Sequence, residues 1–410
     1  MLSGFGQSVS SAGAVTAWTN GYWFDGTSFQ KRDMYSVDGR LTAKRPRQTD
    51  RTVDLAGGYV TPAFGEAHNH NLPAPNTTEM IRTYLSQGIF YVMIQANIPQ
   101  ARAQLKGLIN TPGSIDAVFA NGVFTAPGGH PSALVERNIR GGSMTVSDRD
   151  GGFLLPVSSV ADVDRQWLRV RSQRPDFIKM VLAYSEERGN GWSPPAGSDR
   201  YGLDPNKIPQ HIVQLAHHDK LRVSAHVESA GDFEVAVAAG VDIVAHMPGF
   251  WPDRQRIATK GAGIYEIKDE VAKRAGRQHI TVVTTLGGQL RDFESEPAAA
   301  SYRQALLDVY RHNFAILTKY GVRIAIGSDQ YRSTSIPEAL AIHKAGLMAS
   351  VPLLRALSTD TANTILPARS PFNLTEGSPA DFLVFDTDPV ADFTAIERIR
   401  LRVKDGNQVP

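Results

Sequence analysis

The sequence predicts an α/β fold, namely a (β/α)8 TIM barrel with a small β-sandwich domain built from both chain ends. Eight strand-like apolar runs follow one another between residues 59 and 329, and segments with helical periodicity lie between them. Strands that alternate with helices pair in parallel, and eight such units suggest closure into a barrel. An open doubly wound sheet gives a similar pattern, and the polar residues described below favour the barrel.

The elements can be assigned in chain order. The strand-like runs are YVTPAF (59–64), GIFYVMI (88–94), DAVFANGVF (116–124), DFIKMVL (176–182), RVSAHV (222–227), DIVAHM (242–247), ITVVTTL (280–286) and RIAIGSD (323–329). Helical periodicity marks segments 77–87, 161–173, 208–219 and 298–320. Residues 14–58 and 367–408 instead hold short alternating strands with turn signals. We therefore expect these two flanks to form a small β-sheet domain beside a barrel of residues 59–366.

Composition excludes several classes of protein. With 42% apolar and 20% charged residues, the 410-residue chain is typical of a globular protein. A formal net charge of +2 gives no large field to hold nucleic acid or a membrane surface, and no apolar run approaches twenty residues. The chain has 0 cysteines, which excludes disulfides, thiolate metal ligands and cysteine nucleophiles. Any bound metal ion therefore needs histidine and carboxylate ligands.

The N-terminal residues predict no signal peptide, because they lack a basic segment followed by an apolar one. The compartment therefore stays open: cytoplasmic for the chain as given, and exported or periplasmic if a leader has been removed.

Polar residues recur where the predicted strands end. His68 and His70 alternate at the end of the first strand, so both side chains face one side of an extended chain. The other members of this set are Lys179 within strand four, His226 at the end of strand five, His246 at the end of strand six and Asp329 at the end of strand eight. Each has an ordinary structural explanation taken singly. Together they lie where barrel enzymes carry their catalytic groups, and neutral imidazoles with a carboxylate suit Zn²⁺ or a similar ion.

This order of residues resembles the amidohydrolase superfamily of metal-dependent hydrolases along nearly the whole chain. LAGGYVTPAFGEAHNH (55–70) is similar to that family's first barrel strand, and NLTEGSPADFLVFDTDP (373–389) to its return strand. TAPGGHP (125–131) resembles the imidazolonepropionase-like and prolidase-like branch. Two positions depart from the usual pattern, since Glu66 stands where an aspartate usually begins D-x-H-x-H, and Ser328 where G-T-D has threonine.

The resemblance implies a binuclear metal centre. His68, His70 and Asp329 would hold one divalent ion, most simply zinc, and His226 and His246 a second. Lys179 would carry a CO₂-derived carbamate that bridges both ions, since a protonated lysine has no lone pair to donate. A metal-bridging hydroxide would attack the substrate, while Asp329 moves its proton to the leaving group. Asp329 and Lys179 are thus the expected catalytic residues.

The substrate is expected to be a small molecule with an amide (C–N) bond, in a dipeptide-like, N-acyl or cyclic amide compound. His130, Tyr184 and Arg332 are candidate substrate contacts, although a loop histidine, a packed tyrosine and a surface salt bridge are the ordinary alternatives. Several loop aromatics after the strands suggest an apolar pocket, namely Trp192, Tyr201, Phe250, Trp251 and Tyr331.

Other functions remain open at this point. A lactonase or esterase would use the same site. A mononuclear deaminase fits less well, because it typically carries H-x-x-E where this chain has His226-Val227-Glu228. A non-catalytic binding protein would be expected to have lost ligands. No nucleic acid or membrane partner is expected, and a homo-oligomer is compatible with the sequence.

Overall fold

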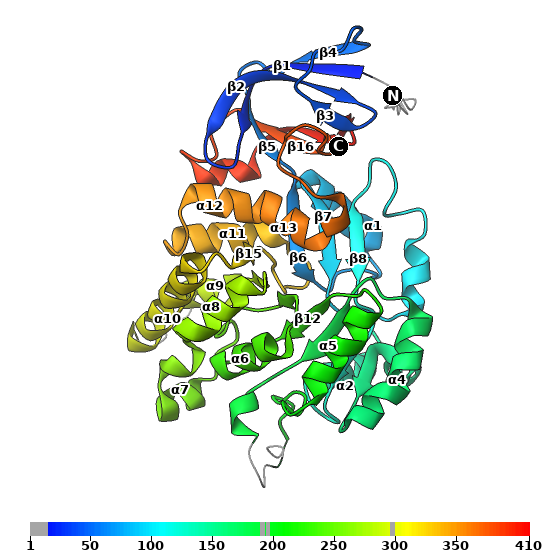
Figure 1. Ribbon diagram of the computed structural model, residues 1–410, viewed down its shortest axis with the longest axis vertical. Coiled ribbons are helices and arrows are strands. Elements are labelled where there is room, and N and C mark those ends of the chain that lie inside the picture. The colour runs from blue at the N-terminus through cyan, green and yellow to red at the C-terminus, as the bar shows by residue number, and fades with distance from the viewer. Residues whose placement is uncertain (1–14, 189–192, 194–196, 296–299) are drawn as a thin grey trace.

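Strands from both ends of the chain form a single eight-stranded sheet. The computed structural model describes residues 15–188, 193, 197–295 and 300–410. The sheet has the order β18-β17-β16-β5-β1-β2-β3, and β4 pairs with β1 beside β5. Its members are β1 (Val15–Phe24), β2 (Phe29–Val37), β3 (Arg40–Thr42), β4 (Arg51–Asp54), β5 (Tyr59–Pro62), β16 (Phe382–Phe385), β17 (Ile399–Lys404) and β18 (Asn407–Val409). Figure 1 shows this terminal sheet at one end of the molecule.

The terminal sheet has its own apolar core. Trp18 and Trp23 are completely or almost completely buried and both contact Phe382, with ring centroids 5.0 and 5.1 Å apart. Because Trp18 and Trp23 come from β1 and Phe382 from β16, the two ends of the chain share one core. Residues from both flanks thus contribute strands to one shared sheet.

The remaining strands run parallel to one another in two sheets. One sheet has the order β6-β7-β8, and the other the order β10-β9-β11-β12-β13-β14-β15. The first consists of β6 (Phe64–Asn69), β7 (Ile89–Ile94) and β8 (Asp116–Phe119). The second consists of β9 (Val123–Thr125), β10 (Leu154–Pro156), β11 (Ile178–Val181), β12 (Val223–His226), β13 (Ile243–Val244), β14 (Thr281–Val283) and β15 (Arg323–Ala325). Most of these strands are buried throughout, as expected for parallel strands covered on both faces.

Backbone hydrogen bonds connect the two parallel sheets at both sides. Ala67 donates to the carbonyl of Ile326 at 2.9 Å, which joins β6 to the residues after β15. On the other side, Asp176 donates to the carbonyl of Phe119 at 2.8 Å, which joins β8 to the residues before β11. The first and last strands of the parallel series are thus neighbours.

Two strand boundaries differ from those expected. Residues 59–64 do not form one strand of the parallel series, because β5 pairs antiparallel with β16 and the chain passes to the parallel strands after Pro62. The run 116–124 is divided into β8 and β9, and Asn121 between them adopts a left-handed φ of 61°. An apolar run in the sequence cannot reveal either break.

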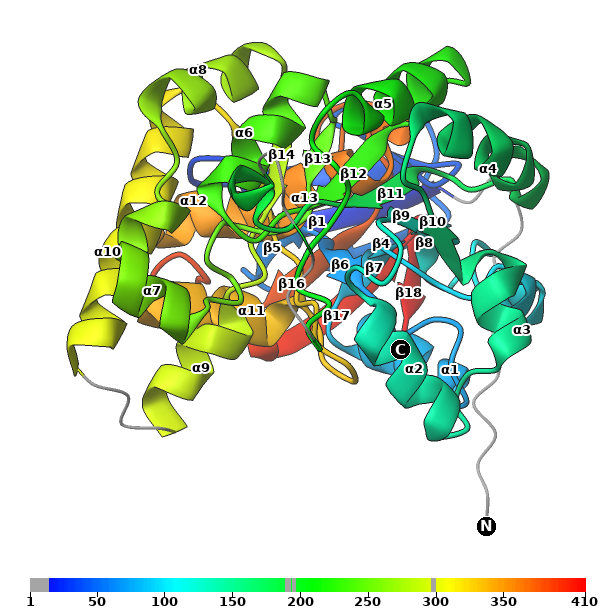
Figure 2. The same cartoon turned by 90° about the horizontal axis from the view of Figure 1, so that it is seen from below.

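Helices surround the parallel strands, as the end view of Figure 2 shows. They are α1 (Thr77–Ser86), α2 (Ser132–Arg140), α3 (Val146–Asp148), α4 (Val160–Gln173), α5 (Ile208–His218), α6 (Ala230–Ala239), α7 (Arg254–Lys260), α8 (Asp269–Arg277), α9 (Gly287–Ser295), α10 (Ala300–Lys319), α11 (Ser335–Lys344), α12 (Ser350–Arg355) and α13 (Thr361–Ile365). The four helices expected from periodicity correspond to α1, α4, α5 and α10, with residues 298–299 outside the described part. Across the described residues, no helix has both the length and the apolar character that crossing a bilayer requires.

Candidate functional site

The ends of β6 and β15 bring the first histidine pair against Asp329. The backbone N–H of Asp329 donates to the carbonyl of His68 at 2.8 Å. Asp329 Oδ1 then lies 3.4 Å from His68 Nε2 and 3.3 Å from His70 Nε2. Gly327 makes this approach possible, because a Cβ at that position would lie 2.6 Å from the backbone nitrogen of His68. The glycine of the G-S-D sequence is therefore a packing requirement of the site.

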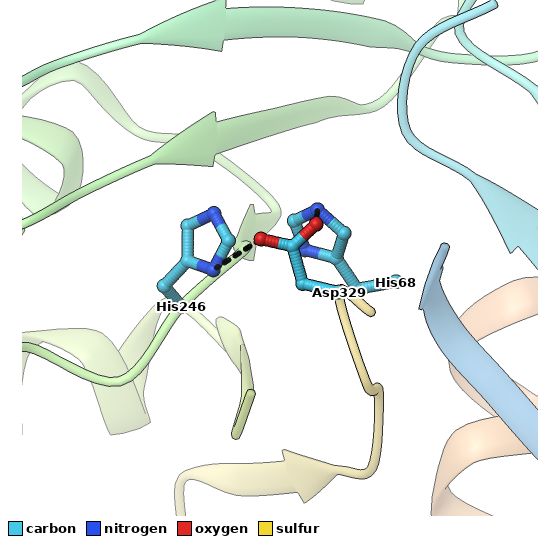
Figure 3. Close-up of side chains that lie close together, drawn as sticks. All are labelled: His68, His246 and Asp329. Atoms are coloured by element: carbon cyan, nitrogen blue, oxygen red, sulfur yellow. Dashed lines mark ion pairs between the residues drawn. The ribbon is translucent and has the colours of Figure 1, made fainter. Parts of the chain in front are cut away.

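His246, which follows β13, closes the group from the opposite side. Its Nδ1 lies 4.0 Å from Asp329 Oδ2, and its ring centroid is 4.4 Å from that of His68. Figure 3 shows the Asp329 carboxylate near both imidazole rings, with a dashed line from one of its oxygens to His246. One donor atom from each of these three residues lies within 4.8 Å of the others, a spacing suited to one metal ion. His246 also stacks on Phe250 at a centroid distance of 3.8 Å, which fixes the plane of its ring.

Hydrogen bonds hold the histidine rings in defined orientations. His68 Nδ1 lies 2.8 Å from the carbonyl oxygen of Ala245, and His70 Nδ1 lies 3.2 Å from that of Ala96. A carbonyl oxygen only accepts, so in both rings Nδ1 is the donor and the neutral Nε2 keeps a lone pair towards Asp329. This arrangement is typical of histidines that ligate metals.

Burial keeps the imidazoles neutral. Burial lowers the pKa of both His68 and His246 well below the usual value for histidine. Burial and the adjacent Lys179 together lower the pKa of His226 to about 3. Burial raises the pKa of Asp329, but the positive charges that His68, His70 and Lys179 can carry outweigh this effect and hold the pKa below its usual range. Neutral nitrogens beside an ionised carboxylate are the protonation states that a divalent cation needs.

Lys179 lies on β11 and only 4% of its surface is exposed. Its Nζ donates to Gln95 Oε1 at 3.2 Å, and Ser224 Oγ donates to the same oxygen at 2.8 Å. Burial lowers the pKa of Lys179 to about 7, although Asp329 raises it. A substantial fraction of the amine is therefore uncharged near neutral pH, which gives it a free lone pair.

Glu66 connects the segment that carries His68 to the segment that carries Asp329, a role that the sequence did not reveal. Its Oε1 accepts from the backbone N–H of His68 at 3.1 Å and from that of Ser328 at 2.8 Å. Burial raises the pKa of Glu66 to about 8. The residue thus ties the strand that carries His68 to the residue preceding Asp329.

A pocket of about 430 Å³ lies over this group. All six predicted ligands line it, together with His130, whose ring centroid is 4.7 Å from that of His226. Burial lowers the pKa of His130 to about 4. The other lining side chains include the aromatic residues Phe153, Phe250, Trp251 and Tyr331 and the polar residues Arg137, Asp199, Thr285, Gln289, Asp292 and Gln330.

Two predicted substrate contacts do not line the pocket. The Tyr184 hydroxyl is buried and contacts that of Tyr265 at 3.2 Å. Arg332 is exposed, and its backbone N–H donates to Asn71 Oδ1 at 2.9 Å. Among the loop aromatics, Trp192 lies outside the described residues. The hydroxyl of Tyr201 donates a hydrogen bond to the carbonyl of Pro127 at 2.9 Å.

Some lining residues were missed for identifiable reasons. Thr285 follows β14, and the two threonines at the end of TVVTT are a signal of the same kind as the strand-end histidines. Arg137 lies on α2, and Gln289 and Asp292 on α9, in helices that follow the strands. The helical periodicity of these segments does not indicate that one face of each helix covers the pocket.

Comparison with known proteins gives similarity in structure alone. No protein-family model and no curated sequence matches the chain. A solved amidohydrolase structure superposes with a TM-score of 0.70 at 20% identity, covering 96% of this chain and 98% of that one. A Xaa-Pro dipeptidase with bound methionine gives 0.70 at 18% identity (96% and 99% covered), and the ochratoxinase of A. niger gives 0.72 at 17% (98% and 97%).

These similarities extend over nearly the whole length of each chain. The protein therefore has the fold of the amidohydrolases and of prolidase-like dipeptidases, and the resemblance noted in the sequence is confirmed at the level of the fold.

Proposed function

We propose that the protein is a metal-dependent hydrolase that cleaves an amide bond in a small-molecule substrate. The observation that carries this proposal is the convergence of four histidines, Asp329 and Lys179 on one pocket. Structures with the same fold include dipeptidases and hydrolases, among them molinate hydrolase and phenylurea hydrolase B.

The donor set fits two divalent ions. His68, His70 and Asp329 would hold one ion, and His226 and His246 the other, with zinc favoured by imidazole and carboxylate ligands. His246 lies near both groups, since its ring centroid is 4.4 Å from that of His68 and 4.5 Å from that of His226. His226 lines the same pocket as the other candidate ligands. Lys179 faces the same pocket, and its uncharged amine is the form that reacts with CO₂ to give a carbamate with loss of one proton. The carbamate would give Lys179 carboxylate-like oxygens, which are suitable metal ligands.

Bound ions of this kind lower the pKa of a water molecule and polarise a substrate carbonyl. The side chains of this protein then have three tasks. The ionised Asp329 accepts the proton of the attacking water at a carboxylate oxygen and returns it to the leaving nitrogen. His130 faces the pocket beside His226 and contacts the substrate. Trp251 and Phe250 form an apolar wall that excludes water from the bond that is cleaved.

The substrate that this pocket fits is a dipeptide-like, N-acyl or cyclic amide compound. A volume of about 430 Å³ accommodates a molecule of two or three residues' size, and the aromatic side chains suit an apolar substituent.

We also propose that the parallel strands form one closed (β/α)8 barrel, with β8 and β9 as two parts of its third strand. The backbone hydrogen bonds between Ala67 and Ile326 and between Asp176 and Phe119 support this closure. The terminal sheet would then be a separate domain, formed by residues 14–58 with β5 and by residues 367–408, and its strands would stack as a sandwich.

Metal analysis and a substrate screen test the proposal. Zinc-reconstituted protein should contain about two ions per chain and hydrolyse dipeptides or N-acyl amino acids, whereas His68→Ala should lose both metal and activity while remaining folded. A content of one ion or fewer would refute the binuclear centre. Turnover of esters or lactones without turnover of matched amides would refute the amidase assignment and leave the metal site intact.

A further inference from the structure

Glu228 lies two residues after His226, in the loop between β12 and α6, and its side chain is completely buried. One carboxylate oxygen, Oε2, accepts hydrogen bonds from Arg200 Nη2 at 2.6 Å and Nε at 3.1 Å. The other, Oε1, has no hydrogen-bond partner among the described residues and lies 3.7 Å from His226 Nε2. That nitrogen is itself buried without a partner. A small movement would thus bring Glu228 Oε1 within hydrogen-bonding distance of His226 Nε2.

The position of this contact distinguishes His226 from the other histidines of the site. His68, His70 and His246 each have an oxygen at Nδ1, provided by Ala245, Ala96 and Thr285 respectively. For His226 the nearby oxygen belongs to Glu228 and lies at Nε2. A hydrogen on Nε2 leaves the lone pair on Nδ1, so the ring would be held in the opposite tautomer.

Hydrogen bonds hold both the backbone of Glu228 and the arginine that pairs with its side chain. Its backbone N–H donates to Asp232 Oδ2 at 3.1 Å, and Asp232 also forms the capping box that begins α6. Arg200 is fixed in turn, because Nη2 donates to the carbonyl of Trp251 at 2.7 Å and the guanidinium lies over the Trp251 ring. The carboxylate therefore has a fixed backbone and a fixed counter-ion.

We propose that Glu228 is a positioning residue for the metal centre: it accepts the Nε2 hydrogen of His226 and thereby presents Nδ1 to the metal ion. Arg200 holds the carboxylate in place beside the ring through the two hydrogen bonds that it donates to Oε2. This inference rests on the proposed metal-dependent function and adds a residue that touches neither the substrate nor the ions. Carboxylates that orient a ligating histidine usually change metal affinity by about 10- to 100-fold when they are replaced.

Zinc affinity, measured by competition with a chromophoric chelator, tests the proposal. Glu228→Gln should weaken binding of at least one Zn²⁺ ion by about tenfold or more, since the amide keeps the shape of the side chain but loses its charge. Glu234→Gln is the matched control, because Glu234 is exposed on the neighbouring α6 and pairs only with Lys268 at 2.7 Å among the contacts described. Zinc affinity in Glu228→Gln within twofold of the wild type and of Glu234→Gln would overturn the inference.

A second measurement needs no variant of Glu228. Long-range ¹H–¹⁵N correlation spectra of the metal-free wild type should show His226 protonated at Nε2, with the signal assigned by its loss in His226→Asn. A hydrogen on Nδ1 would overturn the inference. If the wild type binds no zinc, the proposed function fails as well, whereas two bound ions with an unaffected Glu228→Gln variant refute the inference alone. A lower unfolding temperature of Glu228→Gln at unchanged zinc affinity also refutes it, because Glu228 would then serve only to pair with Arg200.

Discussion

Lys179 is the residue whose chemistry depends most on its surroundings. An amine with 4% of its surface exposed has no carboxylate partner within hydrogen-bond distance among the described residues, and Gln95 offers it a neutral oxygen. Burying an unpaired positive charge in this way is costly, whereas a neutral amine has no charge to desolvate and a carbamate anion would be compensated by bound cations. The surroundings of Lys179 thus favour a form of the side chain that can serve as a metal ligand.

We therefore expect Lys179→Ala to lose bound metal and to reduce kcat/KM by about 100-fold or more, because outer partners of metal ligands alone are worth 10- to 100-fold. Adding a short carboxylic acid such as acetate or propionate should restore part of both, since it supplies the missing bridging oxygens. Metal content and rate with and without the acid provide the measurement. Lys106→Ala is the control, because Lys106 is exposed and lies away from the pocket lining. Normal metal content and rate in unaided Lys179→Ala would leave Lys179 with a structural role only.

At the scale of elements, the ends of the helices that follow β14 and β15 are joined by one buried acid. Glu338 of α11 accepts the backbone N–H of Leu286 at 2.7 Å and also that of Gly287, which begins α9. Burial raises the pKa of Glu338 from 4.5 to about 7, more than the hydrogen bonds from the backbone N–H groups of Leu286 and Gly287 lower it. The folded protein therefore retains this proton at pH values where the unfolded chain has released it.

A pH dependence follows from that difference. Because the folded-state pKa is raised, the stability contributed by the protonated acid is fully present below about pH 4.5 and is lost as the pH rises through about 7. For the metal-free proteins, we expect the unfolding temperature of Glu338→Gln to rise relative to that of the wild type as the pH is raised from 5 to 8. Glu79→Gln, on the exposed face of α1, should show no such trend. A constant difference between Glu338→Gln and the wild type across this range would contradict the prediction.

Helix α2 contributes Ala133, Leu134 and Arg137 to the lining of the pocket. Arg137 has an exposed guanidinium, so a substrate carboxylate can reach it. We expect Arg137→Gln to raise KM for amide substrates with a carboxylate by about tenfold, the loss of roughly one charge-assisted hydrogen bond, with little change in kcat. Arg332→Gln tests the residue suggested by the sequence and should change KM little, because Arg332 does not line the pocket. The opposite ranking of the two variants would restore Arg332 as the carboxylate contact.

Much of the site was predictable because strand ends impose position. His68, His70, His226, His246 and Asp329 all follow or end parallel strands, and parallel strands bring their carboxyl ends to one edge. Glu228 and Arg137 could not be placed in the same way. Their roles depend on contacts across loops and helix faces, and such contacts leave no period in the sequence. Tyr184 shows the converse, since proximity to Lys179 in sequence did not place it in the pocket.

At the scale of the whole molecule, a buried ionic cluster connects the terminal sheet to the parallel strands. Lys404 of β17 is only 2% exposed, and its Nζ lies 3.1 Å from Asp116 Oδ2, at the start of β8. Arg369 donates to the same oxygen at 2.8 Å, and Tyr91 of β7 donates to Asp381 Oδ2 at 2.5 Å. These contacts join residues separated by more than 250 positions in the chain. The cluster thus fixes the far end of β7 and β8, whose other ends lie nearer the pocket.

We expect Lys404→Met to destabilise the protein without changing the metal centre. Lys404→Met leaves Asp116 with Arg369 as its remaining cationic partner. Loss of one partner from a buried ion pair typically costs about 3–5 kcal/mol, whereas an exposed pair is worth at most about 1 kcal/mol. Urea unfolding should therefore show a large loss for Lys404→Met and a small one for Lys319→Met, since Lys319 pairs with Asp269 at 2.7 Å on the surface. Zinc content and kcat/KM of folded Lys404→Met should match the wild type, because the cluster does not line the pocket. If zinc is lost at urea concentrations where the variant is still folded, the terminal sheet supports the metal centre directly and the two parts of the molecule act as one unit.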